Sequence, residues 1–274
     1  DDSGNEVDSA ALVAAIQAGD VAEVRRLLDD NVNWVLQLNS HNYSTMALAA
    51  HFGQIEVLRA IFQMGGNVEP DDDADITPMY AAACAGHVDV VRLLVTEMGA
   101  DANSENDIPP IVLACSRGHL PLLRYLMEEL HIELPRGVDG LDPLHAAAGA
   151  NHMEVVRYLL TKHGLDVNLR STNLKTLLHC AAQGGQMDMV EMLVGEWRAD
   201  VNVVDDRDAT PLTCAIQCGH LHVVQYLMAN GASTSMGDPL RAACMAGRVD
   251  ILRWLLDLGL RPSNVHDLVM AAAG

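Results

Sequence analysis

Three aspartates at alternate positions, Asp71, Asp73 and Asp75, have the spacing with which a calcium-binding loop begins. Such a loop also needs a glycine at its sixth position for a sharp turn and a glutamate at its twelfth as a bidentate ligand. These two positions are Ile76 and Ala82, so neither requirement is met. We therefore expect no calcium site, and the carboxylates remain as a patch of negative charge.

Six cysteines are the next candidates for chemistry: Cys84, Cys115, Cys180, Cys214, Cys218 and Cys244. Cys214 and Cys218 are four residues apart, which places them on one face of a helix. No second Cys or His pair follows at zinc spacing, and the chain has no CxxC pair. We expect buried free thiols with no metal and no cofactor, which favours a reducing compartment, the cytoplasm or the nucleus.

Twelve histidines raise the question of acid–base catalysis. Most of them recur at fixed positions of a repeating pattern: His87, His119, His152 and His220 at one position, and His145 and His179 at another. The sequence has no HExxH, no GxSxG, no phosphate-binding loop and no Cys/His nucleophile pair outside that pattern. Repetition favours architectural roles, so we expect no enzyme activity and no catalytic residue.

The elements that carry these residues repeat with a period of about 33 residues, which is typical of a solenoid. One column is always alanine: Ala15, Ala49, Ala82, Ala114, Ala147, Ala181, Ala215 and Ala243. Four residues after each alanine is a chain-reversal position: Gly19, Gly53, Gly86, Gly118, Asn151, Gly185, Gly219 and Gly247. Small residues in the alanine column would let neighbouring helices approach closely, and a larger side chain would overpack them.

Apolar residues fall at helical spacing on both sides of each reversal, so each unit is predicted to be two short antiparallel helices. One such column is Leu27, Ile61, Leu94, Leu126, Leu159, Leu193, Leu227 and Leu255. Proline follows a capping side chain at Thr77, Asp142, Thr210 and Asp238. This order places the cap just outside the first helix and the proline at its first position.

These motifs resemble the ankyrin repeat family, most clearly in TPMYAA at 77–82, DPLHAA at 142–147, GHVDVVRLL at 86–94, GLDVN at 164–168 and RADVN at 198–202. The resemblance implies an all-α repeat solenoid of stacked helix-turn-helix units whose exits form β-hairpin fingers. It also implies protein binding through the fingers and the concave first-helix face. In this family the last Asn of such an exit can be hydroxylated, so Asn168 and Asn202 are candidates. The alternative is that both simply brace the turn.

We expect a single ankyrin repeat domain over residues 1–274, with eight repeats and the start of a ninth at 264–274. Because the pattern stops inside a repeat, we also expect further domains of the same chain beyond Gly274. The step from the seventh to the eighth reversal is 28 residues, against 32 to 34 elsewhere. The fingers should therefore be short or missing in the last repeats, with no strand pairing between 229 and 238.

The formal net charge of −20 excludes a cationic footprint, so we expect no nucleic-acid partner. Acid is concentrated in the linkers between repeats, which predicts either an acidic ridge for a basic partner or loops that serve solubility. From the family positions and these linkers, the candidate partner-binding residues are Tyr43, His51, Phe52, Asp72, Asp73, Asp75, Ile76, Glu105, Asp107, Ile108, Ser116, Arg117, Leu141, Lys175, Gln183, Asp206, Arg207 and Gln217.

No run of 18 apolar residues is present, so no direct membrane insertion is expected. The resulting functional hypothesis is a non-enzymatic scaffold that binds a protein or peptide through its concave face and acidic fingers. A hypothesis of a different class makes the repeats the targeting or substrate-recruitment arm of a larger multidomain enzyme or ubiquitin ligase receptor. A third treats them as a spacer without a ligand.

Overall fold

The computed structural model describes residues 3–30, 44–69, 76–103, 108–135 and 142–261, and these residues form helices joined by turns. The chain divides into two compact units, residues 1–134 and 135–274. Unit 1 contains α1 (Ser3–Ala18), α2 (Val21–Asp30), α3 (Thr45–His51), α4 (Ile55–Gln63), α5 (Pro78–Ala85), α6 (Val88–Thr96), α7 (Pro110–Arg117) and α8 (Leu120–Arg124), which continues as the π-helix η2 (Tyr125–Glu129).

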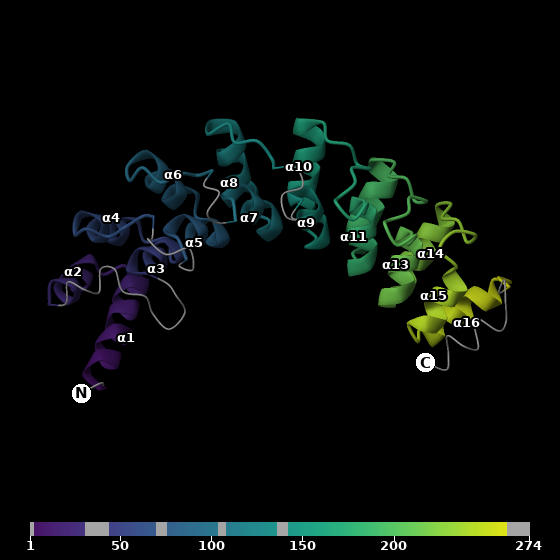
Figure 1. Cartoon of the computed structure of the whole chain (residues 1–274), viewed down its shortest axis with the longest axis horizontal. Helices are drawn as coiled ribbons and strands as arrows, with labels where there is room; N and C mark the ends of the chain where they lie inside the picture. The colour runs from purple at the N-terminus through teal and green to yellow at the C-terminus, as the bar shows by residue number, and fades with distance from the viewer. Residues whose placement is uncertain (1–2, 31–43, 70–75, 104–107, 136–141, 262–274) are drawn as a thin grey trace. The chain divides into compact units, whose positions relative to one another are not determined.

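Unit 2 repeats the same arrangement with α9 (Pro143–Gly149), α10 (Met153–His163), α11 (Leu177–Gly184), α12 (Met187–Glu191) continuing as the π-helix η3 (Met192–Glu196), α13 (Pro211–Cys218), α14 (Leu221–Ala229), α15 (Pro239–Met245) and α16 (Val249–Asp257). Within each unit the first helices pack side by side (Figure 1): α3, α5 and α7 in unit 1, and α9, α11, α13 and α15 in unit 2. The prediction of an all-α repeat solenoid is confirmed. The expectation of one uninterrupted domain over 1–274 stays a prediction.

The first helices begin where the capping pattern predicts. Thr77 Oγ1 accepts from Tyr80 N at 2.9 Å, and Asp142 Oδ1 accepts from Leu144 N at 3.0 Å. Thr210 and Asp238 cap α13 and α15 in the same way, and each of these four caps is followed by proline. The side chain satisfies an amide that has no partner inside the helix, while proline occupies a position where an amide would be unsatisfied.

The eight chain-reversal positions all adopt the left-handed conformation, with φ between 63° and 85°. Glycine tolerates this conformation without strain, and Asn151 is of the residue type that tolerates it next best. The alanine column lies at the centre of the packing. Seven of its members, from Ala49 to Ala243, are fully buried, and Ala15 is 6% exposed. A side chain larger than alanine would therefore overlap the neighbouring first helix.

The described exits from the repeats form hydrogen-bonded turns, and apart from single bridge residues at Ser44 and Ile76 no strand is present in the residues that the structure describes. In unit 2, Ser171 N donates to Lys175 O and Asp205 N donates to Ala209 O, each at 2.9 Å. Bonds across so short a loop close a fingertip but leave no length for a strand ladder. These two fingers of unit 2 are therefore tight turns rather than β-hairpins. The stretch from 229 to 238 is likewise without strand pairing, as its short step predicts.

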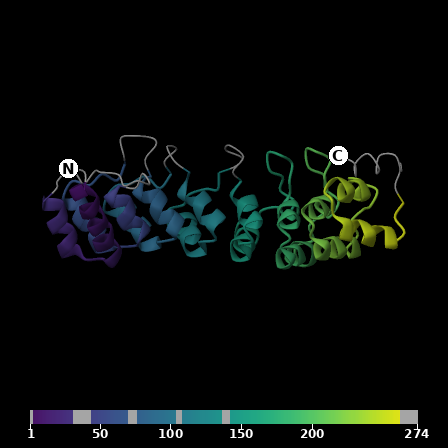
Figure 2. The same cartoon turned by 90° about the horizontal axis from the view of Figure 1, so that it is seen from below.

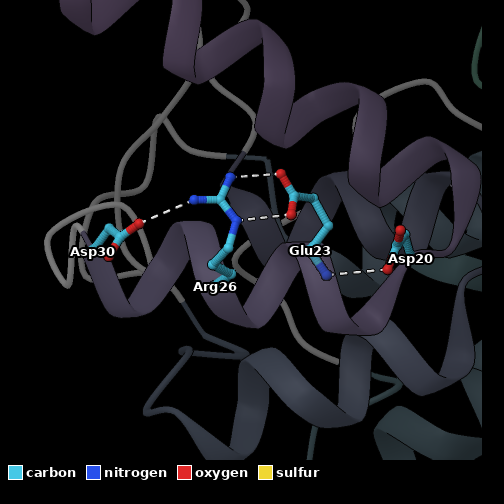
Figure 3. A network of polar contacts seen from close by, with 4 residues as sticks. All are labelled: Asp20, Glu23, Arg26 and Asp30. Carbon is cyan, nitrogen blue, oxygen red and sulfur yellow. Dashed lines mark hydrogen bonds and ion pairs between the residues drawn. The ribbon is translucent and has the colours of Figure 1, made fainter.

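The second helices carry ion pairs on their outer faces. On α2, Arg26 bonds Glu23 in a bidentate manner at 2.7 and 2.8 Å and reaches Asp30 at 3.2 Å, while Asp20 caps the helix at Glu23 N (Figure 3). Further along, an arginine of one repeat pairs bidentately with a glutamate of the next: Arg59 with Glu97, Arg92 with Glu129, and Arg157 with Glu196. These pairs are exposed, so solvent screening limits their contribution to stability.

Candidate functional site

Within each unit, a ladder of side-chain bonds runs along the edge formed by the chain reversals. At six of the eight reversals, the residue after the reversal donates to a carbonyl of the preceding repeat, two residues before that repeat's own reversal. The bonds are Gln54 Nε2 to Gln17 O, His87 Nε2 to His51 O, His119 Nε2 to Cys84 O, Gln186 Nε2 to Gly149 O, His220 Nε2 to Gln183 O and Arg248 Nε to Gln217 O, at 2.5 to 3.0 Å. Because the last carbonyls of a helix lack internal partners, these glutamine, histidine and arginine side chains serve as inter-repeat caps.

Two buried histidines form hydrogen bonds to the main chain of the fingers in unit 2. The carbonyls of Leu169 and Lys175 both accept from His145 Nε2, at 3.0 and 2.9 Å. Ala209 O accepts from His179 Nε2 at 3.0 Å, and Thr176 N donates to His179 Nδ1 at 3.1 Å. Burial lowers the pKa of His179, because desolvation disfavours the charged ring. Both rings are therefore engaged in fixing loops.

The described candidates of unit 1 lie at the first-helix ends and at the finger bases. The rings of His51 and Phe52 meet edge to face with centroids 5.1 Å apart. Ile108 is 37% exposed, Arg117 is exposed, and Ile76 and Ser116 are half-buried. Beside Ile108 is a hollow of about 10 Å³ lined by Glu69, Thr77, Met79, Tyr80, Asp101, Ile108 and Pro110. A hollow of this size has no room for a small ligand.

The candidates of unit 2 form two groups. Lys175 Nζ donates to Gln183 Oε1 at 3.0 Å, which joins a finger to the first helix α11. Asp206 N donates to Asn173 O at 3.2 Å, which joins two successive fingertips. The side chains of Asp206, Arg207 and Gln217 are exposed. The remaining candidates, Tyr43, Asp72, Asp73, Asp75, Glu105, Asp107 and Leu141, and the partial ninth repeat at 264–274, lie outside the described residues.

The two candidate hydroxylation positions have bonds that brace the turns. Asn168 Oδ1 accepts from Asp200 N at 2.9 Å, and Asn202 Oδ1 accepts from Ser233 N at 2.7 Å. Asn202 Nδ2 also donates to Gly231 O at 3.1 Å. Each asparagine thus links its exit to that of the next repeat, which favours the bracing role, while hydroxylation stays a prediction.

Metal-binding groups and thiols are the other candidates for chemistry in this chain. In the described part of the chain, no cluster of three or more His, Cys, Asp or Glu is arranged to hold a metal ion. All six cysteines are free thiols, and burial raises the pKa of Cys214 to about 12. A surface hollow of about 320 Å³ lies on the reversal edge of unit 1 and is lined by Gly53, Ile55, Gly86, His87, Val88, Asp89 and Val90. No described helix has the length and apolar character to span a membrane.

Comparison with known families decides the classification. A family described as Ankyrin repeats (3 copies) matches residues 65–136, 111–205 and 198–265, which together span most of the chain. The chain belongs to the ankyrin repeat family. Ankyrin repeats are protein-interaction domains, so the surface candidates above are where a partner would be sought.

Individual relatives and one solved structure agree with this classification. The Ankyrin repeat and KH domain-containing protein mask of Drosophila melanogaster is 35% identical over 100 residues, which is 35% of this chain and 2% of that protein. Alpha-latrocrustotoxin-Lt1a of Latrodectus tredecimguttatus is 24% identical over 155 residues, 56% of this chain and 9% of the toxin. The crystal structure of the human ASB11 ankyrin repeat domain has a TM-score of 0.67 and 24% identity, covering 81% of this chain and 98% of that chain.

Some surface features of this ankyrin repeat chain were missed by sequence reasoning. Met245 is 65% exposed and lies two residues before its reversal, in the same register as His51 and Gln217. Counting that register in the eighth repeat would have found it. Leu169 and Leu174, 36% and 41% exposed, lie in a finger whose charged residues are basic, although the linkers as a whole are acidic. Their exposure depends on how the loop turns, which the spacing does not reveal.

Proposed function

We propose that this chain binds a protein or peptide segment along the surface formed by its first-helix ends and its fingers. The observation that carries the proposal is that main chain and side chain have different roles at these positions. The main chain of His51, Gln183 and Gln217 is fixed by the next repeat, while their side chains are at least partly exposed. Rigid backbone with variable exposed side chains lowers the entropy lost on binding, which favours a recognition surface.

The acidic fingers are proposed to favour a basic partner. The net charge of −20 and the exposed carboxylates of Asp101, Asp206 and Asp208 support electrostatic attraction of a basic surface. The competing explanation is that the acid keeps a half-apolar repeat array dispersed. Both explanations are consistent with the acidic composition, but only electrostatic attraction of a partner makes binding depend on where the acidic residues lie.

The test begins with crosslinking mass spectrometry of the full-length protein in its native lysate, followed by affinity measurement with the partner so found. Asp71, Asp72, Asp73 and Asp75 are replaced together by asparagine. The matched control neutralises Asp29, Glu154, Asp188 and Glu191, which are exposed acids on second helices. Weaker binding with a smaller salt dependence, only in the first variant, supports the ridge. Equal behaviour of the two variants refutes it.

A second proposal makes the repeats the recruiting arm of a longer multidomain enzyme or ubiquitin ligase receptor. The observation that favours it is that the matched segments make up only 2% and 9% of the relatives' own lengths. A catalytic or ligase-recruiting domain in the complete chain would support it. Lack of any saturable partner would instead favour the spacer hypothesis.

The location is proposed to be a reducing compartment inside the cell. All six cysteines are free, and Cys115 and Cys214 are buried among the first helices. Free thiols persist where glutathione and thioredoxin keep them reduced. Fractionation of cells with an antibody against the chain would test this, and recovery from the secretory pathway would contradict it.

A further inference from the structure

Two neighbouring fingers of unit 2 are built as rigid loops. We call residues 169–175 the basic finger and residues 203–209 the acidic finger; they are green in Figure 2, where both project from the same side of the unit 2 helices. His145 holds both ends of the basic finger, at the carbonyls of residues 169 and 175. Within that finger Leu174 N donates to Ser171 O at 2.9 Å. The bond from Asp206 N to Asn173 O then joins the tips.

Leu174 is an unexpected residue for the tip of the basic finger. It has φ 55°, in the left-handed region that leucine rarely adopts, and its side chain is 41% exposed. The equivalent residue of the acidic finger is Asp208, with φ 58°, and aspartate is a type that tolerates this backbone. Glycine or asparagine would fit the backbone of the basic finger better than leucine. Because the side chain of Leu174 stays partly exposed among the described residues, its burial does not offset the backbone strain. This points to a contact with another molecule.

The two fingers carry opposite charge. Arg170 and Lys175 give the basic finger +2. In the acidic finger, Asp205, Asp206 and Asp208 against Arg207 give −3 + 1 = −2. Lys175 is tied to Gln183, so Arg170 is the exposed cation of the basic finger, while Asp206 and Asp208 are exposed carboxylates of its neighbour. Leu169 and Leu174 add apolar surface to this pair of charges.

We propose that these two fingers bind a peptide segment in which an apolar side chain is flanked by an acidic residue on one side and a basic residue on the other. The apolar side chain packs on Leu174 and Leu169, the acid pairs with Arg170, and the base pairs with Asp206 or Asp208. Apolar contact supplies the affinity, and the opposite charges of the fingers fix the direction of the segment. This inference rests on the proposed function and specifies its partner chemistry for unit 2.

The test selects a displayed library of random short peptides against the complete chain and measures the affinity of the enriched peptides for variants. Leu174→Asn keeps a residue suited to the left-handed backbone but removes the apolar side chain. Arg170→Glu reverses the exposed cation, and Arg253→Glu is the matched control because Arg253 is exposed on α16. We expect acid–apolar–base sequences, a loss of about tenfold or more with L174N and with R170E, and no change with R253E.

A thermal melt of L174N separates recognition from structure. If the leucine acts only in binding, the melting midpoint is unchanged or higher, because the strain is relieved. Lower midpoint and weaker binding together would show that Leu174 packs within the fold and would overturn the inference. Enriched peptides that ignore both L174N and R170E would also overturn it, while leaving the proposed function intact. Failure to enrich any saturable peptide would overturn both.

Discussion

Replacing Gly185 by alanine tests whether the reversals are set by backbone conformation alone or also by the next repeat. Gly185 has φ 68°, and a Cβ at this position would lie 2.5 Å from His220 Nδ1 and 2.6 Å from His220 Cε1. Real carbon atoms do not approach a ring so closely, so the imidazole would have to move. In moving, it would lose its 3.0 Å bond to Gln183 O.

The size of the effect follows from three contributions. Alanine in the left-handed region costs about 1 to 2 kcal/mol. The smaller entropy of the unfolded chain offsets about 0.5 kcal/mol of this. Displacing His220 costs about 1 kcal/mol for the hydrogen bond and about 1 kcal/mol for the poorer rotamer. Gly185→Ala should therefore lower the free energy of unfolding by about 3 kcal/mol, of which about 2 come from the ring.

Gly164→Ala is the matched control because Gly164 has φ 59° and no atom within 4 Å of the added Cβ. It should cost only about 1 kcal/mol. Urea unfolding followed by circular dichroism measures both variants, and the Gly185→Ala/His220→Ala double variant completes the cycle. Without the ring, the Gly185 substitution should cost no more than the control. Equal costs for the two single variants, or an unchanged cost after His220 is truncated, would refute a role for the neighbouring ring.

Three further predictions follow from the same contacts. Arg92→Ala and Glu129→Ala should destabilise the chain slightly and non-additively, and their coupling in urea unfolding should shrink as salt is added, because the pair is exposed. Folding lowers the pKa of His179, so the folded protein binds this proton more weakly than the unfolded chain does. The free energy of unfolding should therefore be highest above the unfolded pKa of about 6.5 and should fall as the pH drops towards the lower folded pKa. His179→Gln should reduce this dependence of stability on pH in unfolding curves measured across the same range. Burial raises the pKa of Cys214 to about 12, so Cys214 should resist iodoacetamide in the native protein and react after unfolding, whereas half-buried Cys218 should be labelled before it, as peptide mass spectrometry would show.

Much of the fold could be predicted from local sequence because its determinants are local. A left-handed reversal needs Gly or Asn, a helix start needs a capping oxygen, and a close helix seam needs alanine; each requirement is visible at one position and repeats. The Arg–Glu pairs were not foreseen, because their partners are 37 to 39 residues apart and fall in two columns that must be compared across repeats. The fingers were expected as β-hairpins, but in unit 2 a loop as short as that from Asp205 to Ala209 leaves no residues to form a ladder.

The contacts that stack the repeats also determine where recognition can vary. At six reversals, the next repeat bonds a carbonyl two residues before the reversal, whatever the side chain there: Gln17, His51, Cys84, Gly149, Gln183 or Gln217. In the fingers, His145 and His179 likewise bond carbonyls. Because the main chain carries these bonds, side chains at the same positions can change without loss of the stack. Leu174 is likewise bonded through its main chain, its N donating to Ser171 O, so its substitution should separate binding from folding, whereas loss of the His145 ring would disturb both.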